Sequence, residues 1–118
     1  MAVEMLRLVR QAGGIRMITT RTGLDHTEGM QRWADSRLAE LERANLSGYV
    51  LKKDSPSCGM ERVKVYDHNM VPSKTGQGLF AEALIARFPF LPVEEEGRLV
   101  DPQLRDNFVE RVFAYRRL

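Results

Sequence analysis

The single cysteine of this chain, Cys58, lies in a short polar segment that could present a reactive sulfur. The segment reads Lys52-Lys53-Asp54-Ser55-Pro56-Ser57-Cys58-Gly59 and directly follows the apolar residues Tyr49-Val50-Leu51. A cysteine that only fills a core usually lies within an apolar run, because the free thiol behaves as a small hydrophobe. Here two lysines lie nearby, and their charge favours the thiolate, the form that attacks electrophiles or binds metals. The pattern therefore indicates a site of chemistry, although a purely structural thiol also fits it.

Three other polar segments carry candidate binding residues. Thr75-Gly76-Gln77-Gly78 precedes a predicted helix whose first N–H groups could bind an anion, although glycines needed for a tight turn explain it equally well. The hydroxyl-rich segment 19–22 either binds a polar ligand or caps itself. Glu94-Glu95-Glu96 resembles a solvated charge run, but it directly follows a predicted strand. We predict substrate-binding roles for Thr19, Thr20, Thr75, Gly76, Gly78 and Glu96.

Composition limits the class of protein. The 118 residues suffice for one domain with a core, and 43% hydrophobic and 29% charged residues are ordinary for a globular protein. A single cysteine excludes an intrachain disulfide and favours a reducing, cytoplasmic location. No apolar stretch is long enough to span a bilayer, so we expect no membrane partner. The net charge of +2 is too balanced, and the basic residues too scattered, to predict nucleic-acid binding.

Alternating and helical patterns predict the elements that position these segments. Residues 5–9 and 15–19 read as strands joined by a turn at Gly13-Gly14. A helix should follow, with Asp25 as N-cap and Glu28 as its capping-box partner. Its apolar positions recur at helical spacing and predict a buried face, formed by Met30, Trp33, Ala34, Leu38, Leu41 and Ala44.

The second half of the chain continues the alternation. Residues 49–51, 63–66 and 91–93 read as short strands, residues 67–74 as a loop and residues 79–88 as a helix. Asp101 should cap a last helix with Pro102 at its first position. The apolar side chains predicted to form that helix's buried face are Leu104, Phe108, Val109, Val112 and Phe113.

Strands that alternate with helices predict one α/β domain over residues 1–118, built on a parallel sheet with flanking helices. Sites in such folds form beyond the carboxyl ends of the strands. The Cys58 segment follows a strand directly, so this edge of the sheet is the expected site.

Segments along the whole chain resemble the family of 2-thiouracil desulfidases. The resemblance rests on residues 51–66, which contain Ser-Pro-Ser-Cys-Gly, and on residues 75–81, 91–99 and 107–115. It implies a three-layer Rossmann-like fold and a 4Fe–4S cluster held by three cysteines. It also implies removal of sulfur from a thiolated base such as 2-thiouracil, a small-molecule partner. Cys58 matches one cluster ligand, and Ser55 and Ser57 match the serine-bearing motif of the catalytic site.

The sequence departs from this family near its beginning. Members carry two more cysteines in an N-terminal segment that has no counterpart here, and Ala2-Val3-Glu4 stands where they read Pro-Arg-Glu. We therefore expect a C-terminal portion of a desulfidase-like domain, truncated at the N-terminus. Such a portion should lack a cluster of its own, be inactive by itself and form a homo-oligomer that covers uncovered apolar surface.

Two other functions stay open from the sequence. A non-catalytic ligand-binding or oligomerisation module would keep Cys58 buried and unreactive. A metal-free cysteine enzyme would need His26 or His68 within hydrogen-bonding reach of the sulfur.

Overall fold

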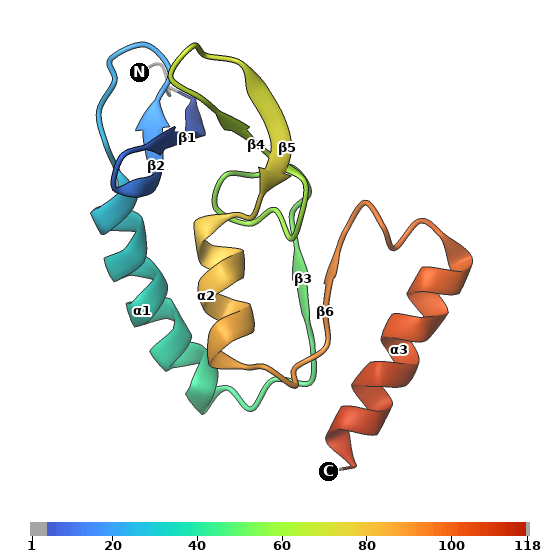
Figure 1. Cartoon of the computed structure of the whole chain (residues 1–118). Coiled ribbons are helices and arrows are strands. Elements are labelled where there is room, and N and C mark those ends of the chain that lie inside the picture. The colour runs from blue at the N-terminus through green and yellow to red at the C-terminus, as the bar shows by residue number, and fades with distance from the viewer. Residues whose placement is uncertain (1–4, 118) are drawn as a thin grey trace.

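The computed structural model describes residues 5–117, which form six strands and three helices (Figure 1). The first half contains β1 (Leu6–Gln11), β2 (Gly14–Thr19), α1 (Thr27–Arg43) and β3 (Tyr49–Leu51). The second half contains β4 (Val63–Tyr66), β5 (Pro72–Gly76), α2 (Leu79–Arg87), β6 (Val93–Glu95) and α3 (Pro102–Arg116). The protein is therefore α/β, as predicted. Ala2, Val3 and Glu4, where the sequence departs from the family pattern, lie outside the described residues.

The larger sheet has four strands in the order β2-β1-β4-β5. Strand β1 pairs antiparallel with β2 across a two-residue turn at Ala12-Gly13, one residue before the predicted position, and it pairs parallel with β4. Strand β5 pairs antiparallel with β4 across a turn in which the Asp67 carboxylate accepts the N–H groups of Asn69 and Val71. The prediction of a loop over residues 67–74 is therefore wrong for its last part.

The remaining strands form a second sheet, in which β3 and β6 pair in parallel and Leu51 lies opposite Glu95. The predicted three-layer parallel sheet is thus not what the strands form, since a mixed sheet and a separate two-stranded ribbon take its place. The physical reason is that two turns, at Ala12-Gly13 and at Asp67, reverse the chain where a parallel sheet requires crossover connections.

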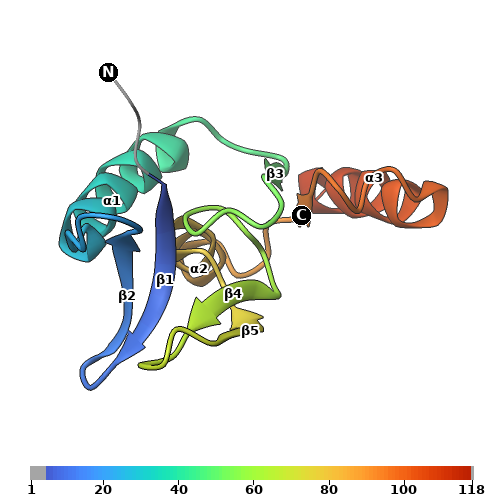
Figure 2. The same cartoon turned by 90° about the horizontal axis from the view of Figure 1, so that it is seen from above.

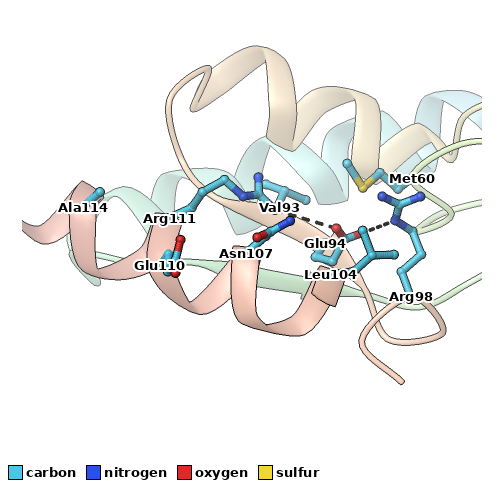
Figure 3. A pocket seen from close by; sticks show the side chains of 9 residues that line it. All are labelled: Met60, Val93, Glu94, Arg98, Leu104, Asn107, Glu110, Arg111 and Ala114. Carbon is cyan, nitrogen blue, oxygen red and sulfur yellow. Dashed lines mark hydrogen bonds and ion pairs between the residues drawn. The ribbon is translucent and has the colours of Figure 1, made fainter. Parts of the chain in front are cut away.

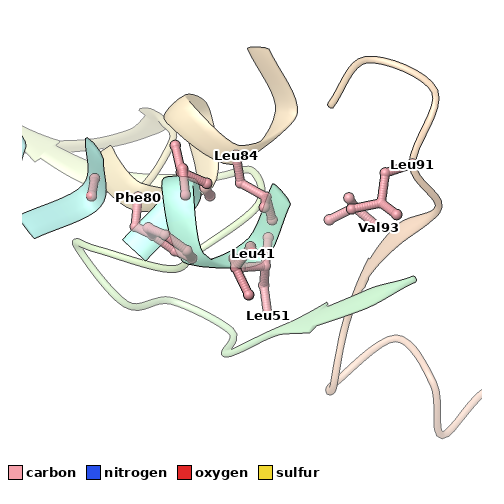
Figure 4. Close-up of a cluster of buried hydrophobic side chains, with 9 residues drawn as sticks. Leu41, Leu51, Phe80, Leu84, Leu91 and Val93 are labelled. Atoms are coloured by element: carbon pink, nitrogen blue, oxygen red, sulfur yellow. The ribbon is translucent and has the colours of Figure 1, made fainter. Parts of the chain in front are cut away.

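The main core lies between α1, α2 and the β3–β6 ribbon. Helices α1 and α2 run side by side in both views (Figures 1 and 2). Their buried side chains form one cluster with those of the ribbon and with Leu91, which lies between α2 and β6 (Figure 4): Ala34, Leu38, Leu41, Leu51, Phe80, Ala81, Leu84, Leu91 and Val93. The helical pattern predicts Trp33 in this core, but it is 51% exposed and packs its ring at 5.2 Å from that of Phe80. A second cluster lies on the inner face of the larger sheet and is formed by the strand residues Leu8, Met17, Val63 and Val65.

The start of α1 differs from the predicted capping box. The helix begins at Thr27, and the N-cap residue His26 makes no side-chain cap. Asp25 instead accepts the Thr27 N–H at 2.9 Å and an Arg16 hydrogen bond at 2.7 Å, while Glu28 also bonds Arg16. The Arg16 hydrogen bond lowers the pKa of Asp25 to about 2, with help from Thr27. Arg16 lies on β2, far from α1 in the sequence. Its hydrogen bond to Asp25 engages the carboxylate that the local sequence pattern predicts as the N-cap of α1.

Helix α3 projects from the rest of the molecule (Figure 2). Its cap is as predicted, because the Asp101 carboxylate accepts the N–H groups of Gln103 and Leu104 and Pro102 stands at the first position. Its predicted buried face is wrong: α3 has no buried residue, and Val109 and Phe113 are exposed. One stripe of the helix is half-buried, formed by Leu104, Phe108, Val112 and Tyr115, since no second layer covers the other faces.

None of the helices described over residues 5–117 has the length and apolar character needed to cross a membrane.

Candidate functional site at the cysteine turn

The turn that carries Cys58 is held by the side chain of Ser55. Its Oγ accepts the backbone N–H groups of Ser57 and Cys58, both at 3.2 Å, and the Ser55 carbonyl accepts the Gly59 N–H at 2.8 Å. Such hydroxyl-to-backbone bonds close a tight turn without a helix or a sheet. The Cys58 thiol is free and half-buried, next to the main core.

The two serine hydroxyls form a directed chain toward the sulfur. Because two N–H groups occupy the lone pairs of Ser55 Oγ, its own proton is left for the bond to Ser57 Oγ, 2.9 Å away. Ser57 then donates its proton to Cys58 Sγ at 3.5 Å. The geometry thus gives the two candidate serines different positions, since Ser57 contacts the sulfur and Ser55 positions Ser57.

Helix α2 begins directly against this turn, and its first N–H groups all bind turn carbonyls. Gly78 N–H donates to Gly59 at 2.7 Å, and Leu79 N–H donates to Pro56 at 3.0 Å. The N–H groups of Phe80 and Ala81 share the Ser57 carbonyl, at 2.7 and 3.0 Å. The prediction that these N–H groups are free for an anion is therefore wrong, because the chain itself supplies their acceptors.

Gly78 is required by the close approach of the two main chains. A Cβ at this position would lie 2.5 Å from the carbonyl carbon and 2.6 Å from the carbonyl oxygen of Ser57. Gly59 is similarly confined, since its Cβ would lie 2.9 Å from the Ser55 carbonyl oxygen. The alternative interpretation of the glycines at 76–78, a tight turn into the helix, is the one that the structure supports.

The acidic residue that reaches the turn is Glu95. It lies at the end of β6, is 5% exposed and accepts the Met60 N–H at 3.0 Å through its carboxylate. Glu96, for which we predict a binding role, is exposed, and its N–H donates to Leu51. The extent of the strand shows why: β6 continues through Val93, Glu94 and Glu95, so it buries two of the three acidic residues.

Glu94 is the acidic centre of a cavity of about 670 Å³ between β6 and α3 (Figure 3). The side chain is buried and accepts the Arg98 Nε–H at 2.6 Å, and Arg111 of α3 lies 3.7 Å from its other oxygen. The Glu94 hydrogen bond raises the pKa of Arg98. Met60, two residues after Cys58, also lines this cavity, which therefore adjoins the cysteine turn.

Replacing Glu94 by glutamine should lower the free energy of unfolding by about 1–2 kcal/mol, because a charge-assisted bond to Arg98 is weakened. The value is modest because both arginines are about half exposed and remain solvated. Glu96→Gln, two residues further along and exposed, is the matched control and should change stability by less than about 0.5 kcal/mol. Urea unfolding followed by circular dichroism measures both. Equal effects of the two substitutions would contradict a structural role for the buried carboxylate.

The remaining predicted residues do not gather at one place. Thr19 is buried at the end of β2, where its Oγ1 contacts Thr22 Oγ1 at 2.7 Å and accepts the Leu24 N–H at 2.8 Å. Thr20 lines a different cavity, which it shares with Asp54 and Pro56 of the cysteine segment. Thr75 is exposed on β5, with its Oγ1 3.1 Å from Ser73 Oγ. Thus Thr20 lies beside the cysteine turn, whereas Thr19 and Thr75 bond residues of other segments.

The residues of this chain do not fit an iron–sulfur cluster by themselves. A 4Fe–4S cluster is held by several cysteine thiolates, and the sequence contains one cysteine. Within residues 5–117, no three His, Cys, Asp or Glu side chains are grouped as a metal site would require. In the same part of the chain, neither His26 nor His68 forms a hydrogen bond with Cys58, whose sulfur contacts Ser57. The geometry thus gives no support to a cysteine–histidine nucleophile.

Comparison with known proteins assigns this turn to a family. The family model described as 2-thiouracil desulfurase matches residues 2–96, which include the cysteine turn, α2 and β6 but not α3. No curated protein and no solved structure matches the chain. The matched residues make up most of the chain, and they include Ser55, Ser57, Gly78 and Glu95 around the cysteine turn. The chain therefore belongs to the 2-thiouracil desulfurase family.

Proposed function

We propose that this protein takes part in removing sulfur from a small thiolated base such as 2-thiouracil. In the overall reaction the thiocarbonyl carbon gains an oxygen from water and the sulfur leaves as hydrogen sulfide, so no electrons are exchanged. The family match carries this proposal, since it spans the turn that presents Cys58. The supporting geometry is the directed hydroxyl chain from Ser55 through Ser57 to the sulfur.

The proposed roles follow from the positions of the side chains. Ser57 holds a proton within 3.5 Å of Sγ, so it is the residue able to hydrogen-bond a sulfur atom that is bound or released at this turn. Ser55 positions Ser57 and fixes the backbone of Cys58. Glu95 holds the far side of the turn through Met60 and places a buried carboxylate there.

The iron–sulfur cofactor stays a prediction from the resemblance. Cys58 supplies one thiolate, so the other cluster ligands would have to come from outside these 118 residues. We accordingly propose that the 118 residues release no sulfide by themselves.

The decisive experiment measures sulfide and uracil formed from 2-thiouracil by the product of the complete gene, reconstituted anaerobically with iron and sulfide. We expect the two products in equal amounts, and none from the 118 residues alone. Cys58→Ser should abolish the release, and Ser57→Ala should slow it by about 100-fold or more, as loss of a positioned proton donor does. Ser73→Ala, which removes an exposed hydroxyl from β5, is the control and should leave the rate unchanged.

A second candidate is a non-catalytic module, and the lone cysteine is the observation that favours it. In that case the reconstituted protein would release no sulfide, and Cys58→Ser would leave ligand binding or self-association intact. Self-association is itself a prediction from the sequence. Sedimentation of the wild-type protein and of a Phe113→Ser variant, altered at an exposed apolar residue of α3, tests it directly.

A further inference from the structure

A row of positive charges crosses the outer face of the larger sheet. Leu8 and Val65 pair in parallel and face the core, so the preceding residues of each strand, Arg7 and Lys64, lie side by side on the opposite face of the sheet. Across the next strand pair, Lys64 lies opposite Lys74. Like charges directly opposite one another on neighbouring strands destabilise a sheet. Three such residues on three adjacent strands therefore need an explanation.

These three residues line one cavity of about 400 Å³, next to the cysteine segment. Arg62 adds a fourth positive charge to its wall, while Asp54 supplies the single carboxylate. Within residues 5–117, none of the four basic side chains forms an ion pair. The cavity thus concentrates uncompensated positive charge in a partly enclosed space.

A second, independent observation concerns the side chain of Arg7. Its Nε is buried and has no hydrogen-bond partner among the described residues. The carbon of its guanidinium group lies 5.0 Å from the centre of the Tyr66 ring, which also lines the cavity. Stacking of this kind fixes the plane of the guanidinium group, and a buried donor without an acceptor is costly to the fold. An anion bound in the cavity would supply the acceptor that the described chain does not.

We propose that this cavity binds a phosphate group, either free or as part of a small phosphorylated molecule. A monocarboxylate would leave most of the charge of Arg7, Arg62, Lys64 and Lys74 uncompensated, whereas a dianion with several oxygens matches it. A volume of about 400 Å³ is within the range of small-molecule sites and exceeds what the phosphate group alone fills. The Thr20 side chain on the same wall offers a further donor. This inference is independent of sulfur removal at Cys58.

The test is a calorimetric titration of the 118-residue protein with inorganic phosphate and with glycerol 3-phosphate, at constant ionic strength. We expect saturable binding at one site. Tighter binding of glycerol 3-phosphate would assign the site to a phosphorylated molecule, and equal binding would assign it to free phosphate. Acetate and glycerol serve as the monocarboxylate and uncharged probes, and binding of acetate as tight as that of phosphate would overturn the assignment.

The double substitution Lys64→Gln with Lys74→Gln should weaken phosphate binding by about tenfold or more, because two charge-assisted contacts are lost. Both lysines are exposed, so the variant should fold, and its melting temperature without phosphate should be no lower than that of the wild type. Arg10→Gln, on the same strand as Arg7 but outside the cavity wall, is the charge control and should keep wild-type binding. Unchanged binding in the double variant, or equal weakening by Arg10→Gln, would overturn the proposal.

Discussion

Replacing Gly78 by alanine should lower the free energy of unfolding by about 3 kcal/mol or more, since overpacking against rigid main chain is at the costly end of such changes. The added Cβ would lie 2.5 Å from the Ser57 carbonyl carbon and 2.7 Å from the Cys58 nitrogen. No flexible side chain can move aside there, so the start of α2 must separate from the turn. Urea unfolding followed by circular dichroism measures the loss.

Gly29→Ala is the matched control for this substitution. Gly29 lies within α1, and the atom nearest to an added Cβ would be the end of the Arg32 side chain, at 3.8 Å. Alanine there should raise the free energy of unfolding by about 0.5–1 kcal/mol, because glycine is the weaker helix former. A Gly78→Ala protein as stable as the wild type would mean that α2 does not abut the cysteine turn in solution.

Phe80→Ala should cost about 3–5 kcal/mol, the range for removal of a fully buried aromatic ring. Phe80 is 1% exposed, and its ring lies 5.2 Å from that of Trp33 and 5.9 Å from that of Tyr49. The cavity left behind would open the junction of α1, α2 and β3. Alanine keeps the N–H that bonds the Ser57 carbonyl, but without the packing of the ring the start of α2 is held less firmly, so the substitution should loosen the cysteine turn.

Phe90→Ala provides the comparison, because this ring is 82% exposed and its removal should change stability by less than about 0.5 kcal/mol. The rate of Cys58 modification by a thiol reagent gives a second measurement, which should rise in Phe80→Ala and stay constant in Phe90→Ala. Similar stability losses in the two variants would contradict the arrangement of the core.

The elements predicted correctly from the sequence are those whose determinants are local. Asp101 and Pro102 start α3 through contacts within one helical turn, and the chain reverses between β1 and β2 at Ala12-Gly13, within one residue of the predicted turn. The cysteine segment is likewise recognisable as a turn, because Ser55 bonds residues only two and three positions away. Such contacts depend on neighbouring residues, which the sequence displays directly.

The wrong predictions depend on partners far away in the chain. Strand β5 has no apolar residue between Pro72 and Gly76, and only its pairing with β4 makes it a strand. The pattern of α3 indicates a buried face, but no element of the described chain lies over Val109 and Phe113. Glu94 is buried because Arg98 and Arg111 compensate its charge, and no local signal connects residue 94 with residue 111.

The phosphate cavity and the cysteine turn share one short piece of chain. Asp54 and Pro56 line the cavity, while Ser55 and Ser57 hold the sulfur. Alternate residues of the segment therefore line the cavity and hold the sulfur. A ligand in the cavity would press on the same loop that presents Cys58, without contacting the sulfur itself.

The attachment of α2 to the turn involves main-chain atoms alone, from Gly78 to Ala81 on one side and from Pro56, Ser57 and Gly59 on the other. These hydrogen bonds do not depend on side-chain identity, although the side chains of Leu79, Phe80 and Ala81 are also packed in the core clusters. Mutational tolerance should therefore be highest at Pro56, lower at the packed positions 79–81 and minimal at the two glycines. A saturation library selected for folding should show this contrast, with the strictest requirement at Gly59 and Gly78.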